Sequence, residues 1–198
     1  MRARRGKRPF TFIAIVLMSV VFAANGIISW DGELLGSSLW GGGRIVDSLG
    51  LSYEAVFERV QLYRLLTYGY VHAAVWHLLA NAFAVWIVGG YLERKIGTAL
   101  LVLVYHAGLV LAGAAIFLIY PNSFNYGASP AVFSCFGLLI HWQMRNKTLL
   151  REYRAQKGFG YCVLFLVLSN LLGWASFAIH LMGAAAGFLL GFFVRERK

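Results

Sequence analysis

One serine and two histidines fall at corresponding places in three strongly apolar segments. Ser129 precedes the next basic residue by sixteen positions, which is about 24 Å along a helix. His180 lies fifteen positions before Arg195, which is about 22 Å along a helix. His77 lies sixteen positions before Glu93, which is about 24 Å. We therefore expect all three side chains at one level, several Å below one surface of a hydrocarbon layer about 30 Å thick.

A serine beside a histidine is the minimal pair for nucleophilic catalysis. The imidazole accepts the hydroxyl proton while the oxygen attacks a carbonyl, and later returns it to the leaving group. The reaction also needs donors to the developing oxyanion. His77, Asn81 one turn deeper on the same helix face, and the backbone N–H of Ser129 could supply them. On this interpretation Ser129 and His180 are the catalytic residues.

The same residues also allow structural interpretations. Ser129 before Pro130 is a common helix start, in which the serine caps the helix and the proline occupies its first turn. A single histidine in a membrane helix often joins helices by hydrogen bonds, and we apply that interpretation to His106 and His141.

A zinc site built from His72, His77 and His180 is disfavoured. His72 and His77 are five residues apart, so on one helix they would point in different directions. No carboxylate or thiol is expected at their depth. We expect no metal and no other cofactor.

The composition indicates which kind of protein must position these side chains. Of the 198 residues, 60% are hydrophobic and 13% charged, and the mean hydropathy is +0.68. Soluble domains carry about 25% charged residues, so this chain is solvated by lipid. We predict an all-α polytopic membrane protein with six transmembrane helices. They run approximately over Phe10–Ile28, Val71–Leu92, Ala99–Ile119, Ser129–Met144, Phe159–Leu172 and Ser176–Val194.

The net charge of +10 follows this topology. Fifteen of the 18 basic residues lie before the first segment, after the second, between the fourth and fifth, and after the sixth. All of these places are on one side of the membrane, which is the positive-inside pattern. They are Arg2, Arg4, Arg5, Lys7, Arg8, Arg94, Lys95, Arg145, Lys147, Arg151, Arg154, Lys157, Arg195, Arg197 and Lys198. The charge thus indicates cytoplasmic termini and an attraction to anionic lipid, and it requires no nucleic-acid partner. Residues 1–9 are predicted as a cytoplasmic basic N-terminus, 10–194 as one membrane domain and 195–198 as a cytoplasmic basic tail.

Small residues follow His180 at regular spacing. Gly183, Gly187 and Gly191 lie along nearly the same helix face as the histidine. Such a stripe allows a neighbouring helix to approach closely. We expect that neighbour to be the helix that starts at Ser129.

Four motifs, in this order, resemble those of the rhomboid family of intramembrane serine proteases. They are HAAVWHLLANAF from His72, GGYLERKIG at 89–97, GASP at 127–130, and HLMGAAAG from His180. In addition, Tyr63-Arg64 resembles the Trp-Arg pair of the family's first outer loop. The similarity covers about Tyr63 to Gly191.

This resemblance implies a rhomboid-like bundle of six transmembrane helices and a Ser129–His180 dyad without a third acidic member. It implies an oxyanion site that uses His77 and Asn81. It gives supporting roles to His72, Gly127, Phe133, Gly183 and Gly187, with Phe133 packed on the catalytic histidine. It also implies cleavage of single-pass transmembrane proteins near the outer end of their helix, without a cofactor. The compact chain suggests a bacterial plasma membrane.

Three positions depart from the family pattern. Pro130 replaces the glycine after the serine, Phe133 stands where tyrosine is frequent, and Ile179 replaces a small residue beside the histidine. The alternative function is therefore a catalytically inactive rhomboid-like protein that binds membrane-protein clients. A transporter or channel is disfavoured, because no charged pathway crosses the inner half of the segments.

Overall fold

The computed structural model describes residues 8–29, 42–155 and 158–196. These residues form helices, and they contain no strand beyond an isolated antiparallel bridge between Leu51 and Asn125. The longer helices are α1 (Pro9–Ile28), α5 (Val75–Ala84), α7 (Thr98–Ala115), α8 (Ser129–Arg145), α10 (Phe159–Ser169) and α11 (Trp174–Leu190). The shorter ones are α3 (Arg44–Leu49), η1 (Glu54–Glu58), α4 (Arg64–Thr67), η2 (Tyr68–Tyr70), η3 (Val85–Gly89), α6 (Gly90–Ile96), η4 (Ile116–Leu118), α9 (Lys147–Arg154) and η5 (Asn170–Leu172).

By length and composition, three stretches of helix are able to cross a membrane: Pro9–Ile28, Val75–Ile96 and Thr98–Leu118. The second stretch joins α5, the π-helical turn η3 and α6. It runs over Val75–Ile96, so the predicted bounds Val71–Leu92 were wrong at both ends. Val71 and Ala74 are extended, which delays the helix start, and the helix continues past Leu92 until Gly97 adopts a φ of 86°. Phe159–Ser169 and Trp174–Leu190 are shorter apolar helices.

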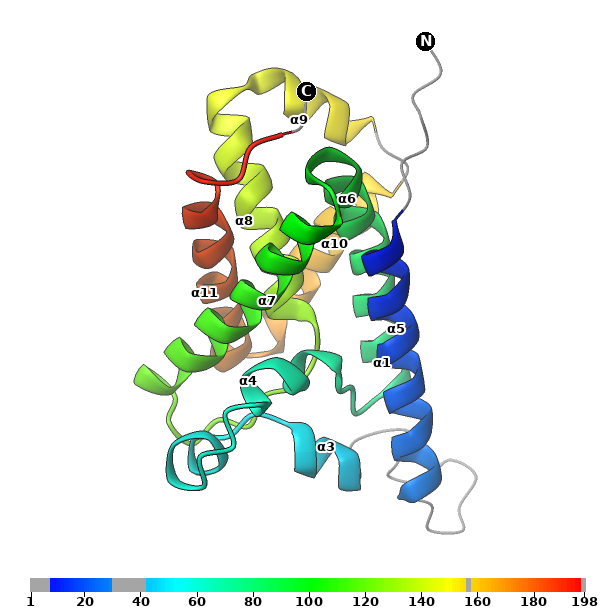
Figure 1. Ribbon diagram of the computed structural model, residues 1–198, viewed down its shortest axis with the longest axis vertical. Coiled ribbons are helices and arrows are strands. Elements are labelled where there is room, and N and C mark those ends of the chain that lie inside the picture. The colour runs from blue at the N-terminus through cyan, green and yellow to red at the C-terminus, as the bar shows by residue number, and fades with distance from the viewer. Residues whose placement is uncertain (1–7, 30–41, 156–157, 197–198) are drawn as a thin grey trace.

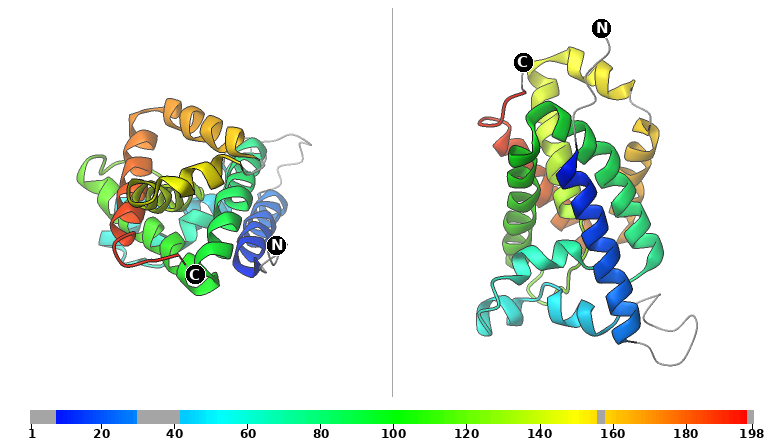
Figure 2. Two further views of the ribbon diagram at one scale, coloured as in Figure 1. Left: turned by 90° about the horizontal axis from the view of Figure 1, so that it is seen from above. Right: turned by 45° about the vertical axis from the view of Figure 1, so that its right-hand side comes forward.

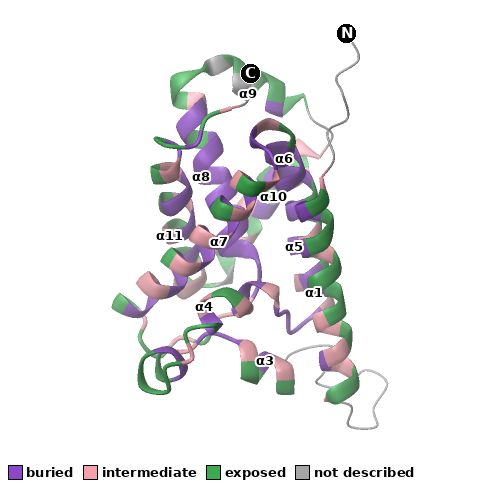
Figure 3. Cartoon of the chain, in the orientation of Figure 1, coloured by how far each residue is buried: buried purple, intermediate pink, exposed green. Residues whose placement is uncertain are grey.

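α8 runs through the inside of the bundle and packs against α7 and α11 (Figure 2). Every residue from Ser129 to Leu139 is buried. The outer helices bury one face and expose the other (Figure 3). The start of α1, the end of α11 and all of α9 lie toward one end of the bundle, and α3 and α4 lie at the other (Figure 1).

The outward surfaces are strongly apolar. Large hydrophobic side chains such as Phe12 and Val20 on α1, Leu103 and Leu111 on α7, and Leu189 on α11 are exposed. A soluble monomer seldom exposes so many large apolar side chains on its helices. These faces fit contact with lipid tails, as the hydropathy predicts.

Glycines allow α8 and α11 to pack backbone against backbone. A methyl group at Gly183 would overlap the carbonyl oxygen of Pro130, and one at Gly187 would overlap that of Ser134. In the other direction, a methyl at Gly137 would overlap the carbonyl oxygen of Ala184. The close approach expected from the small-residue stripe is therefore present, and α8 is the partner helix.

A buried carboxylate fixes the start of α1. Glu93 accepts hydrogen bonds from the backbone N–H groups of Phe10 (2.9 Å) and Thr11 (3.0 Å), and from the Thr11 hydroxyl (2.6 Å). The Thr98 hydroxyl donates to the same carboxylate at 2.8 Å. The first N–H groups of a helix have no partner within it, and the helix dipole favours a negative charge there. Glu93 therefore ties α1 to the junction between α6 and α7.

The close approach of α8 and α11 predicts that one methyl group at Gly187 is destabilising. Gly187→Ala should force the helices apart and lower the free energy of unfolding by about 1–3 kcal/mol, as overpacking typically does. The matched control is Gly160→Ala, because Gly160 is also helical but has open space around its Cα. Denaturant titrations in detergent micelles compare the two variants. Equal stability of both would contradict this account of the interface.

Candidate active site

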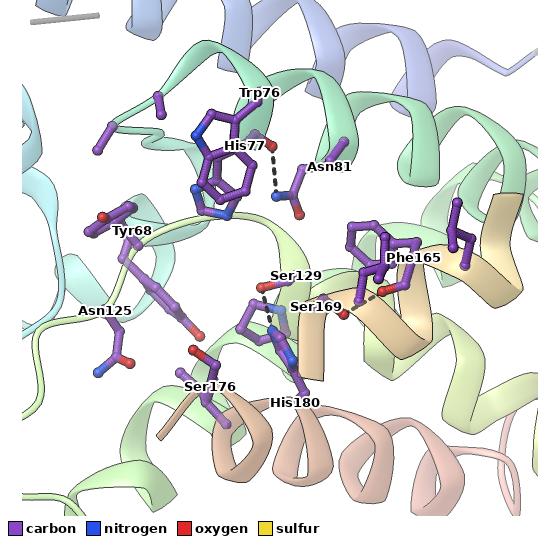
Figure 4. A pocket seen from close by; sticks show the side chains of 18 of the residues that line it. Tyr68, Trp76, His77, Asn81, Asn125, Ser129, Phe165, Ser169, Ser176 and His180 are labelled. Atoms are coloured by element: carbon purple, nitrogen blue, oxygen red, sulfur yellow. Dashed lines mark hydrogen bonds between the residues drawn. The ribbon is translucent and has the colours of Figure 1, made fainter. Parts of the chain in front are cut away.

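Ser129 is the first residue of α8, Ala128 is its N-cap and Pro130 lies in the first turn. The N-cap position thus belongs to Ala128, so the interpretation that Ser129 caps the helix was wrong. The Ser129 hydroxyl instead lies 2.8 Å from Nε2 of His180 on α11 (Figure 4). Both residues are buried, with exposed fractions of 8% and 4%. The structure thus brings together the two side chains that the sequence analysis paired.

The imidazole of His180 is held on three sides. The Phe133 ring stacks on it with a centroid distance of 4.3 Å and an angle of 2° between the planes. Its Nδ1 lies 3.0 Å from Oδ1 of Asn170. Sequence reasoning missed Asn170. The available signal was a polar amide at the end of an otherwise apolar segment, ten residues before His180.

The loop before Ser129 is anchored by backbone hydrogen bonds. Asn125 and Leu51 exchange two N–H···O bonds of 2.9 Å, and the Gly127 N–H donates to the Tyr68 carbonyl at 2.8 Å. The Ala128 N–H points to Nε2 of His72 at a longer distance of 3.5 Å. Irregular backbone at membrane depth is tolerated where protein surrounds it, and these partners meet that requirement.

His72 does not share a helix with His77. It precedes α5, and the two rings meet edge to face with their centroids 5.0 Å apart. The expectation that the two histidines point in different directions was therefore wrong, because it assumed one continuous helix. Among the described residues, no group of three or more His, Cys, Asp or Glu side chains is placed to hold a metal ion.

A cavity of about 530 Å³ opens beside the Ser129 hydroxyl. His77 and Asn81 line it from α5, and Ser129 and His180 line it from the opposite side (Figure 4). The Asn81 amide donates one hydrogen bond of 3.0 Å to the His77 carbonyl, and its buried oxygen has no partner among the described residues. An amide nitrogen carries two hydrogens, so one donor remains for a ligand in the cavity.

His106 and His141 lie outside this cavity. His106 fits the joining role expected of it, because Nε2 lies 2.8 Å from the Tyr70 hydroxyl of η2. His141 has no hydrogen-bond partner among the described residues. Instead its ring meets Phe188 and Phe192 edge to face.

Helices that are long and apolar enough to cross a membrane, with apolar outward faces, define a class: helical membrane proteins. The family model described as "Rhomboid domain" matches residues 59–197 of this chain. The chain belongs to the rhomboid family.

Three curated relatives place it within that family. It is 28% identical over 191 residues to "Rhomboid protease GluP" of Bacillus subtilis, covering 96% of this chain and 35% of that protein. It is 26% identical over 137 residues to "Putative rhomboid protease YdcA" of the same species, covering 69% of each. It is 30% identical over 153 residues to "RHOMBOID-like protein 6, mitochondrial" of Arabidopsis thaliana, covering 74% of this chain and 48% of that protein. The chain thus spans about a third of the first relative's length and about half of the third's.

The contact between the loop and His77 gives a prediction for Gly127. This residue has a φ of 108°, and a methyl group on it would stand 2.6 Å from Cε1 of the His77 ring. Gly127→Ala should therefore combine about 1–2 kcal/mol of backbone strain with about 1–3 kcal/mol of overpacking.

Two comparisons separate these costs. Gly173→Ala is the control for strain alone, because Gly173 has a φ of 125° and open space around it. In a His77→Ala background, the overpacking part of the Gly127→Ala effect should disappear. Free energies of unfolding measured for the four variants form the test, and the account fails if Gly127→Ala costs no more than Gly173→Ala.

Proposed function

We propose that this protein is an intramembrane serine endopeptidase that hydrolyses peptide bonds of transmembrane proteins near the outer membrane face. The observation that carries the proposal is the 2.8 Å contact between Ser129 Oγ and His180 Nε2 at the wall of the cavity. A buried hydroxyl bonded to an imidazole and open to a cavity can attack a carbonyl bound there.

The reaction follows from the positions of these groups. His180 Nε2 accepts the Ser129 proton as Oγ attacks the scissile carbonyl, and then donates it to the leaving amine. A water molecule attacks the resulting acyl-enzyme with His180 again acting as base. His77, Asn81 and the Ser129 N–H are the proposed donors to the oxyanion.

The proposed topology has six transmembrane helices and places both termini in the cytoplasm. The helix α9, whose sequence includes Arg151 and Arg154, and the C-terminal end of the chain lie toward one end of the bundle, which supports that end as the inner one (Figure 1). Residues 1–7 and 197–198, which carry the remaining terminal charges, lie outside the described residues. We assign residues 10–194 to the membrane domain of a bacterial plasma-membrane protein, with single-pass transmembrane proteins as substrates and anionic lipid as a contact.

Removing either member of the pair tests the proposal directly. Ser129→Ala and His180→Ala should each lower the rate of cleavage of a single-pass substrate in liposomes by a factor on the order of 10⁴–10⁶, and the double variant should be little worse. The matched control is Ser134→Ala, which removes another buried serine hydroxyl of α8, one that donates to the Val104 carbonyl at 2.9 Å. Substantial turnover by either single variant would exclude the serine-protease mechanism.

Pro130 is the observation that favours the second candidate, an inactive protein that binds membrane-protein clients. It replaces the family's glycine directly after the serine. In α8, however, proline occupies a first-turn position where its missing N–H removes no intrahelical bond. The serine–histidine contact beside it supports the active enzyme.

Pro130→Gly distinguishes the two candidates. If proline only presets the backbone, the variant should remain active and lose about 0.4–1 kcal/mol of stability, because glycine has more freedom in the unfolded chain. Cleavage of one substrate and labelling of Ser129 by a fluorophosphonate are measured for both proteins. Activity that appears only in Pro130→Gly would identify the natural protein as a client binder.

A further inference from the structure

Asn170 contacts the nitrogen of His180 that faces away from the serine. It begins η5, directly after α10, and its side chain is half-buried. Gly173, with a φ of 125°, then turns the chain into α11, so that His180 returns to face Asn170. The distance from Asn170 Oδ1 to His180 Nδ1 is 3.0 Å.

A second hydrogen bond fixes the orientation of the Asn170 amide. Its Nδ2 donates to the Leu166 carbonyl at 2.7 Å. A carbonyl oxygen can only accept, so the nitrogen of the amide must face Leu166 and its oxygen must face His180. Because Oδ1 can only accept as well, His180 must carry a hydrogen on Nδ1 to bond with it.

This orientation determines the state of the catalytic pair. A neutral imidazole with its hydrogen on Nδ1 has a free lone pair on Nε2. That lone pair faces the Ser129 hydroxyl at 2.8 Å. We propose that Asn170 is a positioning residue that holds the His180 proton on Nδ1 and so keeps Nε2 available as the base. The proposal rests on the serine-protease function for its kinetic consequence, but the tautomer itself does not depend on that function.

The chemistry of the site explains why an amide suits this position. Phe133 stacks on the imidazole and fixes the plane of its ring. Ser129 and Asn170 form hydrogen bonds with its two nitrogens, which prevents the ring from rotating within that plane. A carboxylate in the same place would bring a charge into apolar surroundings, which costs more than a hydrogen-bonded amide. The Asn170 amide orients the ring without that charge, which fits a site with no acidic member.

The kinetic test compares three variants with the natural protein. Asn170→Leu keeps the approximate shape but removes the acceptor, so kcat should fall by about 10-fold or more while KM changes little. Ser134→Ala again serves as the control, since it removes one buried interhelical hydrogen bond from α8 without touching His180. It should retain the natural kcat. An Asn170→Leu variant that folds with natural kcat would overturn the proposal.

Asn170→Asp tests whether the acceptor itself matters. The carboxylate still accepts from Nδ1, so kcat should exceed that of Asn170→Leu. The added charge also stabilises the protonated imidazole, so the activity should begin at a higher pH than in the natural protein. The other titratable side chains that line the cavity with His180 are those of Tyr68, His77, Tyr126 and Tyr161. They are the same in all variants, so they do not cause this difference. An Asp variant no faster than the Leu variant at any pH would contradict the proposal.

Nuclear magnetic resonance of ¹⁵N-histidine-labelled protein tests the tautomer without any turnover. The His180 signals are identified by their loss in His180→Gln. In the natural protein the directly bonded proton should be found on Nδ1, and in Asn170→Leu it should move at least partly to Nε2. A proton on Nε2 in the natural protein would overturn the proposal. Absence of both cleavage and fluorophosphonate labelling in the natural protein would reject the protease function, and the spectra would still decide the role of Asn170.

Discussion

The contact between α8 and α11 is the constraint on which the site depends. Within a membrane, helices gain little from hiding apolar surface, because lipid tails are equally apolar, and they associate through close packing instead. Here backbone carbonyl groups of α8 pack directly against Gly183 and Gly187, and one from α11 packs against Gly137. The side chains of serine and histidine are short, so the two helix backbones must lie close together for Oγ to be 2.8 Å from Nε2.

The rest of the fold supports this contact by satisfying polar groups that lipid cannot. Glu93 accepts from N–H groups at the start of α1 that have no partner within the helix. Buried Arg64 donates to the carbonyl groups of Asp47 and Gly50 at 2.8 and 2.7 Å, which holds the segment beneath the loop that leads to Ser129. Each unsatisfied group would cost several kcal/mol in hydrocarbon. Glu93 and Arg64, which both lie outside the cavity, thus have structural roles that follow from their surroundings.

Sequence patterns predicted the parts of this structure that depend on periodicity and length. Apolar runs located the longer helices, and four-residue spacing placed Gly183 and Gly187 on the face that meets α8. The errors arose where loops decide the outcome. The apolar run that begins at Val71 predicts a helix that includes His72. The backbone is instead extended at Val71 and Ala74, and the ring of His72 contacts that of His77 from outside the helix.

Asn170 shows a different limit of sequence reasoning. Its contact with His180 is made across a turn at Gly173, and no helical spacing relates the two residues. The direction of its amide depends on the carbonyl of Leu166, a backbone group that any residue at that position would carry. Such a role becomes visible only when the donors and acceptors around the side chain are known.

The start of α8 shows how the first-turn N–H groups and the rigidity of the backbone are balanced beside the nucleophile. The first N–H groups of a helix have no internal acceptor, so they are costly in a membrane and useful toward a developing anion. Ser129 keeps its N–H at this position, while Pro130 has none to leave unsatisfied. The proline therefore removes one orphan donor next to the cavity without touching the donor proposed for the oxyanion. A glycine there would add a donor and backbone freedom together. Pro130 thus lacks the second donor that glycine would offer, and in its place gives a fixed backbone directly after Ser129.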